Sequence, residues 1–522
     1  MTNTQKSILG GVTILSLVGI ICKLIGVFFR VPLLYLIGEE SVGTYQLVFP
    51  TYNLLLTVSS AGLPVAVSRM VSAALAKDDP RGAKRIFKTA LHLLLAIGLV
   101  MTLAMILSGH WLANSLVHDS QTYLGFLAIA PSVLIVCALS AYRGFMQGQQ
   151  NMVPTAVSQL IEQVLKVAIA LPLAWLGSKI SLAHAAAGAL LGTSITEAFA
   201  LLYMMVLVSR KSTAFHALPQ AETKEAPKTK QVLRQLIFTA IPITLGASIV
   251  PLAGFVDSAM IMDRLGHAGF AEAQARALYG CYSGCVINLI NVPTALALAI
   301  SMSLVPAISA AITRNDKDAV RTQSALGLRF SFLIGLPCAI GMSLLAKPIL
   351  HFVYGGTLSA QNFQATADLL AMSSLTIVLF TVVQSTSGIL QGLKKQKIPM
   401  YSLMAGVLAK IVLNAVLIPI PEMNIHGAPI ASIVCYTVSM VPNIIYVCKY
   451  ADLKFDWASI VLRPLAATAA MALAVFIMEK FLPAGRLMLI AKLLVGVGVF
   501  GIAAYYLKAI TKDDLKFIKK RR

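Results

Sequence analysis

The sequence has few charged residues and no long hydrophilic domain. Asp, Glu, Lys and Arg make up only 12% of its 522 residues, whereas 58% are hydrophobic, and the mean hydropathy is +0.81. A soluble globular protein needs far less apolar surface than this. The sequence also lacks a P-loop, a nucleophile elbow and zinc-ligand spacings. We therefore expect a membrane protein that is not an enzyme.

The sequence instead contains many apolar runs that are long enough to span a membrane. A helix of about 20 apolar residues crosses a bilayer, and about fourteen such runs are present. The sequence thus predicts an all-α polytopic membrane protein. The predicted spans are 8–36, 46–75, 88–108, 121–142, 154–176, 182–208, 236–262, 278–308, 326–346, 366–391, 399–420, 427–448, 459–479 and 487–508.

Acidic residues are half as numerous as basic ones, with 21 Asp and Glu against 42 Lys and Arg. The basic excess lies mainly on the side of the membrane that holds both termini. Few basic residues fall on the opposite side: Lys179, Arg264, Arg276, Lys347, Lys480 and Arg486. By the positive-inside rule, both termini are predicted to be cytoplasmic. Because topology and attraction to anionic headgroups explain the charge, we expect no nucleic-acid partner.

Short motifs recur on the two sides of the longest hydrophilic stretch, residues 209–235. Ser72–Asp79 reads SAALAKDD and Ser309–Asp316 reads SAAITRND, at an offset of 237 residues. Gly144–Gly148 reads GFMQG and Gly388–Gly392 reads GILQG, at an offset of 244 residues. The offset of 244 residues also relates Lys166 in the first half to Lys410 in the second. These matches predict an internal duplication of six spans.

The duplication predicts four parts of the chain. Residues 1–208 form an N-terminal lobe, 209–235 a flexible cytoplasmic linker, 236–450 a C-terminal lobe, and 451–522 two further spans with a basic tail. Six is an even number, so the lobes keep one orientation. They are then related by a pseudo-two-fold axis along the membrane normal, with a substrate cavity between them.

Charged and polar residues inside the spans are the candidate functional residues. A charge at the bilayer centre costs roughly 2.5–3.5 kcal/mol on insertion scales, so it is expected to face a polar cavity. The basic excess among them favours an anionic substrate. The candidate substrate-binding residues are Lys23, Arg30, Arg69, Glu162, Lys166, Glu197, Asn288, Asn291 and Lys410.

Local spacing supports several of these assignments. Span five carries Glu162 and Lys166 on one face with Gln159 and Gln163, and we expect the glutamate and the lysine to pair. Such a stripe either lines a cavity or joins helices as structural glue. Snorkelling to an interface is an alternative for Arg30 and Arg69.

Three further features are predicted from single residues. Gly62 and Pro64 predict a bend in span two. Arg329 and Lys492 lie near span ends and are expected to snorkel. Three residues with side-chain oxygens form a candidate sodium site: Asp257, Asn414 and Thr437.

The segment Tyr142–Gln159 resembles the signature of bacterial polysaccharide and lipid-linked oligosaccharide flippases. These belong to the multidrug/oligosaccharidyl-lipid/polysaccharide exporter superfamily. Gly62–Arg69, Val305–Ser309 and the fourteen-span layout extend the resemblance over nearly the whole chain. It is greatest to the stage V sporulation protein B group, relatives of the lipid II flippases. The resemblance implies a V-shaped pair of six-helix lobes in the bacterial plasma membrane.

The resemblance also implies a function. An undecaprenyl-diphosphate-linked sugar, with the peptidoglycan precursor lipid II favoured, would cross from the inner to the outer leaflet by alternating access. Lys23, followed by Leu-Ile-Gly, matches a basic position that binds the diphosphate in that family, and Arg30 lies near a second one. Asp257 resembles an aspartate of the family's sodium site. The family's charged positions in spans two and eight are not kept here, where Asn288 and Asn291 stand in span eight.

Other functions stay open from the sequence. Glu162 and Glu197 are compatible with a cation-coupled multidrug exporter of the same superfamily, although Lys23, Arg30 and Lys166 oppose it. A flippase for another polyprenyl-linked polysaccharide unit is also compatible. Short outer loops disfavour a glycosyltransferase or polymerase. We expect a monomer without a cofactor, driven by a sodium ion or by the membrane potential.

Overall fold

The computed structural model describes residues 3–215, 229–482 and 485–510. Over these ranges the chain is helical and contains no β-strand. Thirteen of the described helical segments are long and apolar enough to cross a membrane. The all-α polytopic fold class predicted from the sequence is therefore confirmed.

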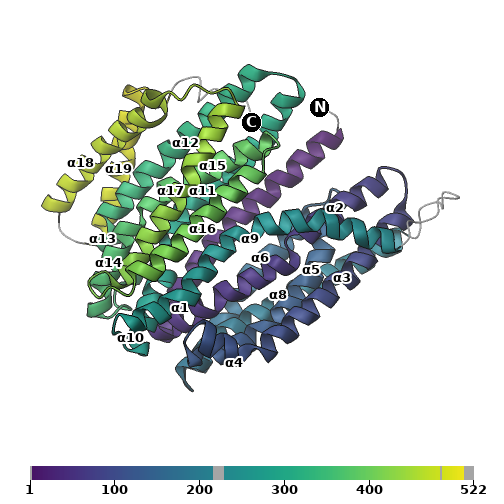
Figure 1. The fold of residues 1–522 in the computed structure, drawn as a ribbon, viewed down its shortest axis with the longest axis horizontal. Helices are drawn as coiled ribbons and strands as arrows, with labels where there is room; N and C mark the ends of the chain where they lie inside the picture. Colours follow the sequence, from purple (N-terminus) through teal and green to yellow (C-terminus); the bar gives the residue numbers. More distant parts are fainter. Residues whose placement is uncertain (1–2, 216–228, 483–484, 511–522) are drawn as a thin grey trace. The chain divides into compact units, whose positions relative to one another are not determined.

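The first of two compact units groups Met1–Gly266 with Phe270–Gly280. Within it α3, α5 and α8 run side by side, and α2 packs on α5 (Figure 1). Its helices are α1 (Asn3–Ser60), α2 (Gly62–Leu75), α3 (Pro80–Leu107), α4 (Gly109–Trp111), η1 (Leu112–Leu116), η2 (Ser120–Thr122), α5 (Tyr123–Gly148), α6 (Val153–Leu165), η3 (Lys166–Ala170), α7 (Leu171–Ser178), α8 (Leu182–Phe215), α9 (Thr229–His267) and α10 (Glu272–Tyr279).

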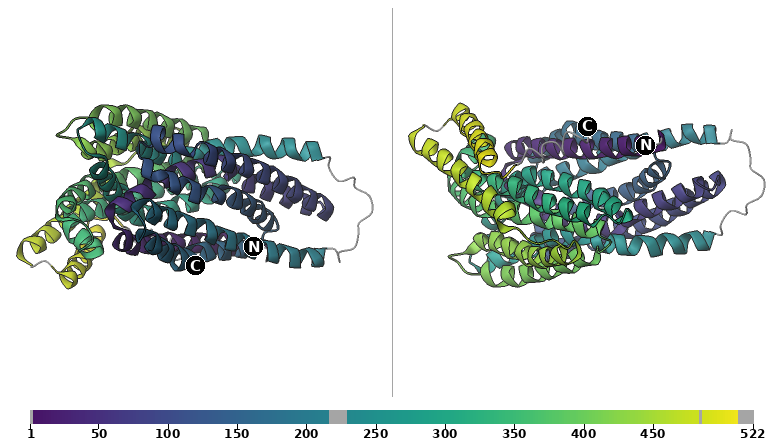
Figure 2. Two further views of the ribbon diagram at one scale, coloured as in Figure 1. Left: turned by 90° about the horizontal axis from the view of Figure 1, so that it is seen from below. Right: turned by 90° about the horizontal axis from the view of Figure 1, so that it is seen from above.

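The second unit comprises Cys281–Arg522 with His267–Gly269. The predicted pair of extra spans is present as α18 and α19, the two yellow helices that lie side by side in Figure 2. α18 also packs against α12. The helices of this unit are η4 (from Gly280 to Val286), α11 (Ile287–Thr313), α12 (Lys317–Leu344), α13 (Ala346–Tyr354), α14 (Ala360–Ser373), α15 (Leu375–Gly392), α16 (Lys397–Leu417), η5 (Asn424–His426), α17 (Gly427–Tyr450), η6 (Ala458–Leu462), α18 (Arg463–Phe481) and α19 (Arg486–Tyr506).

The duplication recurs in the helix packing of each unit. In the first unit, a Cβ atom on Gly144 would lie 2.8 Å from the carbonyl oxygen of Pro64. In the second, a Cβ atom on Gly388 would lie 2.8 Å from the carbonyl oxygen of Ser301. Gly144 and Gly388 are 244 residues apart, which is the offset of one repeated motif. Their partners Pro64 and Ser301 are 237 residues apart, which is the offset of the other. Gly144 thus lets α5 approach α2 in the first unit, and Gly388 lets α15 approach α11 in the second. Small residues commonly allow such close helix packing in membranes.

The turns that follow the repeated motifs also match. Asp78 and Asn315 have nearly equal left-handed φ angles of 53° and 54°. The next residues, Asp79 and Asp316, cap α3 and α12, because their carboxylates accept a backbone N–H three residues on at 2.7 and 2.9 Å. Equivalent sequence segments therefore build equivalent helix starts in the two units.

The helix boundaries differ from the predicted spans at the start of the chain. α1 continues through the first predicted span and into the second as far as Ser60, with a break at Gly38, where φ is 76°. Glycine adopts this left-handed conformation without the steric cost of a side chain. The predicted bend near Gly62 is present, since α1 ends at Ser60 and α2 begins at Gly62.

The spatial division differs from the predicted repeat boundary. Helices extend into both ends of the predicted linker 209–235, and its centre, residues 216–228, lies outside the described residues. α9, assigned to the C-terminal lobe from the sequence, groups with the first unit. α9 contacts α2 at one point within this unit: Gly62 N donates to Thr244 Oγ1 at 3.1 Å, and a Cβ on Gly62 would lie 2.3 Å from the Ala240 carbonyl oxygen.

Candidate functional site

A partly buried ion pair joins α5 to α6 in the first unit. Arg143 Nη2 lies 2.7 Å from Glu162 Oε1, and Arg143 Nε donates to Ser158 Oγ at 2.9 Å. The predicted pairing of Glu162 with Lys166 is therefore wrong. The arginine on the neighbouring helix offers two N–H donors in a fixed planar geometry, and it satisfies both the glutamate and the serine.

Lys166 instead lies among aromatic rings of α1. Its Nζ is 5.1 Å from the ring centroid of Phe29 and 5.3 Å from that of Phe49. It also donates to the hydroxyl of Tyr45 at 3.4 Å. Aromatic faces attract a cation without neutralising it. The direct contacts of Lys166 in this membrane span are thus two rings and a hydroxyl rather than a carboxylate.

The backbone at Lys166 is itself irregular. α6 ends at Leu165, the π-helix η3 begins at Lys166 and ends at Ala170, and α7 follows. Single-turn π-helices inside α-helices are frequent at functional sites. The π-helix η3 lies in the same predicted span as the polar stripe, and Lys166 is its first residue.

Glu197 on α8 is buried and hydrogen-bonded to two other helices. Its Oε1 accepts from the hydroxyl of Tyr52 on α1 at 2.9 Å, and its Oε2 accepts from Ser132 on α5. The two hydroxyls are also 2.8 Å apart. A buried carboxyl in this setting has its polar atoms satisfied, which makes it a strong link between three helices.

The other candidates in the first unit are less closely defined. Lys23 lies on α1, but its side chain is outside the described residues. Arg30 is half-buried, whereas Arg69 on α2 is exposed. Asp257 on α9 is buried. The roles of these four residues in binding stay predictions.

In the second unit, burial separates the candidates. Asn288 and Lys410 are buried, but Asn291 is exposed. Asn414 is fully buried one turn after Lys410 on α16, and Thr437 on α17 donates its hydroxyl to the carbonyl oxygen of Ile433 at 2.8 Å. Asp257 belongs to the first unit and the other two candidate sodium ligands to the second, so the sodium site stays a prediction.

Several residues of this site were missed by sequence reasoning. Arg143, Ser132, Tyr52 and Tyr45 all contact a predicted site residue. Only Arg143 had a usable signal, because it lies inside the signature segment Tyr142–Gln159. The others are uncharged residues in apolar spans, and nothing in their local sequence indicates the partner.

Comparison with solved structures defines the fold. The chain is similar to "Lipid II flippase MurJ, inward closed conformation", with a TM-score of 0.67 and 13% identity over 94% of this chain and 97% of that one. It is also similar to "Inward-facing conformation of a multidrug resistance MATE family transporter of the MOP superfamily", with a TM-score of 0.66 and 15% identity over 83% and 96% of the two chains. The fold is that of the MOP superfamily transporters.

Sequence comparison gives the family. Residues 8–312, more than half of the chain, match the family described as "Polysaccharide biosynthesis protein", and the chain belongs to this family. Residues 283–416 also match the MatE family.

Two curated relatives come from Bacillus subtilis (strain 168). "Stage V sporulation protein B" is 29% identical over 82% of this chain and 81% of the relative. "Lipid II flippase MurJ" is 27% identical over 86% of this chain and 84% of the relative.

Proposed function

We propose that this chain is a flippase for an undecaprenyl-diphosphate-linked oligosaccharide, with lipid II as the favoured cargo. It would move the head group from the inner to the outer leaflet by alternating access. The similarity to a lipid II flippase over 86% of the chain supports this proposal, as does membership of the polysaccharide biosynthesis protein family.

The observation that carries the proposal is the environment of Lys166. A diphosphate bears about two negative charges, and its transfer through a membrane needs cationic partners that are not already neutralised. Lys166 contacts two aromatic rings and a hydroxyl, while the nearby carboxylate of Glu162 pairs with Arg143. Lys166 is therefore placed to attract an anionic head group, together with the predicted contribution of Lys23.

The test is a lipid II flipping assay in cells depleted of their own flippase, with a probe that detects the head group in the outer leaflet. Lys166→Met keeps an unbranched side chain but removes the charge, and we expect the flipping rate to fall on the order of tenfold. Lys23→Ala should also lose activity.

Lys179→Met is the matched control. Lys179 is exposed and lies over the ring of Trp175 at 4.9 Å, so this variant also removes a lysine–aromatic contact, but near the end of the same span. Equal activity of Lys166→Met and wild type at matched expression would refute the role of Lys166. A well-expressed wild type that flips no lipid II would refute the favoured cargo.

An exporter of organic cations is the second candidate. The buried carboxyl of Glu197, held by Tyr52 and Ser132, favours it, since such exporters need acidic groups within the membrane. It predicts that the wild type lowers drug accumulation in cells and that Glu197→Gln abolishes this effect. A flippase for another polyprenyl-linked glycan predicts neither drug export nor lipid II flipping.

A further inference from the structure

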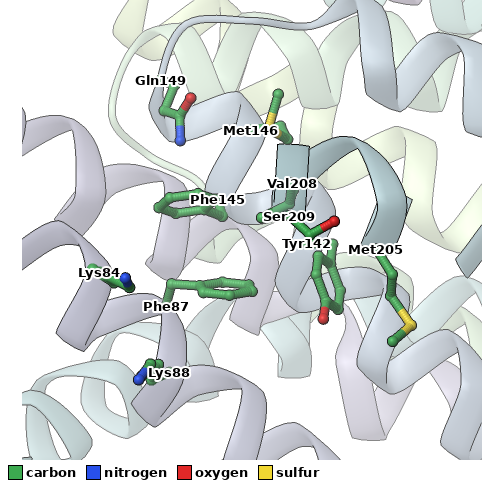
Figure 3. Close-up of a pocket in the computed structure, with 10 residues that line it drawn as sticks. All are labelled: Lys84, Phe87, Lys88, Tyr142, Phe145, Met146, Gln149, Met205, Val208 and Ser209. Atoms are coloured by element: carbon green, nitrogen blue, oxygen red, sulfur yellow. The ribbon is translucent and has the colours of Figure 1, made fainter. Parts of the chain in front are cut away.

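A cavity of about 250 Å³ lies in the first unit, near the start of α3 and the ends of α5 and α8. None of the residues that line it is a candidate site residue. Ten residues line it (Figure 3): Lys84, Phe87, Lys88, Tyr142, Phe145, Met146, Gln149, Met205, Val208 and Ser209. The sequence predicts that this end of the helices is at the cytoplasmic interface.

The wall of the cavity is aromatic and apolar. The ring of Phe87 is 5.1 Å from that of Tyr142 and 4.7 Å from that of Phe145. Met205 lines the cavity and is itself 45% exposed, and Leu202 and Val206 beside it on α8 are also exposed. An apolar surface of a spanning helix faces lipid chains, so the cavity adjoins the bilayer.

One rim of the cavity is cationic. Lys84 and Lys88 are one turn apart on α3 and therefore share a face. In Figure 3 they lie on one side of the Phe87 and Phe145 rings, and Met205 lies on the other. None of the ten lining residues is acidic. The cavity thus presents two positive charges next to an apolar wall that adjoins the membrane.

We propose that this cavity binds an anionic phospholipid of the adjoining leaflet. The phosphate group lies at Lys84 and Lys88, and a segment of acyl chain packs against Phe87, Tyr142 and Phe145. A small hydrophilic anion would leave the apolar wall in contact with water, whereas a zwitterionic lipid carries no net charge to complement two lysines. The bound lipid connects α3 with α5 and α8 and stabilises their packing, whatever cargo the protein carries.

Lipid binding to the purified full-length protein tests this proposal. Native mass spectrometry would measure retention of phosphatidylglycerol and of phosphatidylcholine with the same acyl chains. Wild type should retain phosphatidylglycerol preferentially. The double variant Lys84→Gln/Lys88→Gln should bind it on the order of tenfold more weakly, because two headgroup-facing charges are removed.

The matched control is Lys77→Gln/Arg81→Gln. These two residues are exposed near the same end of the unit and do not line the cavity, so the charge change is the same. Its affinity should stay within roughly twofold of wild type. Equal losses in the two double variants, or equal retention of both lipids by wild type, would show only diffuse attraction and overturn the proposal.

A second pair of variants tests whether an acyl chain binds against the apolar wall of the cavity. Met205→Trp fills the cavity and should reduce phosphatidylglycerol retention, whereas Val206→Trp, on the next residue and outside the lining, should not. Each variant is first checked for a monodisperse elution profile. Full retention by well-folded Met205→Trp would overturn the assignment of the acyl chain to this cavity.

Discussion

Arg276 Nε lies 2.7 Å from Asp119 Oδ2, and the two side chains are 7% and 0% exposed. The arginine also donates to Glu272 at 2.9 Å, and its Nη1 is 3.7 Å from Glu40. The backbone of α10 passes close to α1 at this point, since a Cβ on Gly43 would lie 2.2 Å from the Arg276 carbonyl oxygen. This ion pair therefore joins α10 to α1 and to the segment between α3 and α5.

The pair predicts a large loss of stability in Arg276→Met. Removal of one partner leaves the buried carboxylate of Asp119 without its cation, which costs roughly 3–5 kcal/mol. The thermal unfolding midpoint in detergent should fall, and the double variant Arg276→Met/Asp119→Asn should regain part of it. Arg321→Met is the control, because its pair with Asp452 is exposed and contributes about 1 kcal/mol at most. Equal midpoints of the two single variants would contradict the prediction.

The hydrogen bonds of Glu197 predict a graded response. Glu197→Leu leaves the hydroxyls of Tyr52 and Ser132 without their acceptor, at a cost of about 1–3 kcal/mol. Glu197→Gln keeps an acceptor oxygen and should cost less. Thermal unfolding of the purified variants measures this order. Glu422→Leu, at an exposed position, should leave the midpoint unchanged, and a loss there as large as in Glu197→Leu would point to a general effect of the substitution.

The ion pair of Arg143 predicts that lysine is a poor replacement. A lysine ammonium cannot reproduce the planar donors that reach both Ser158 and Glu162. Arg143→Lys should therefore have a lower unfolding midpoint than wild type, and Arg143→Met a still lower one. Removal of both charges in Arg143→Met/Glu162→Met should restore stability relative to Arg143→Met. If the double variant is the least stable of the three, the two residues do not act as a pair.

Close helix packing predicts which glycines tolerate a side chain. A Cβ on Gly192 of α8 would lie 2.4 Å from the Ala170 Cα, and one on Gly188 would lie 2.3 Å from the Leu173 carbonyl oxygen. These two glycines form a small-xxx-small contact. Gly192→Leu should lower the yield of monodisperse protein and its unfolding midpoint. Gly498→Leu is the control, since nothing lies within 4 Å of its Cβ position; comparable yields of the two variants would show that α8 can move away.

Much of the fold is predictable because membrane insertion depends on local composition. Apolar run length identifies the spans, and the repeated motifs around Gly144 and Gly388 identify the duplication before any contact is known. The glycine and proline before Arg69 mark the bend at the start of α2. Local spacing likewise places Glu162 and Lys166 on one face of span five.

The sequence by itself determined the apolar runs, the repeated motifs and the presence of charges within the spans. Only the tertiary structure decided the partners of those charges. Glu162 pairs with Arg143 rather than Lys166, and Lys492, expected to snorkel, is 2% exposed with Nζ 2.7 Å from Glu479. Arg329 likewise donates to the carbonyl oxygen of Ala509 at 2.7 Å. The physical reason is that hydropathy and helical spacing are local properties, whereas a partner on another helix is set by which helices pack side by side.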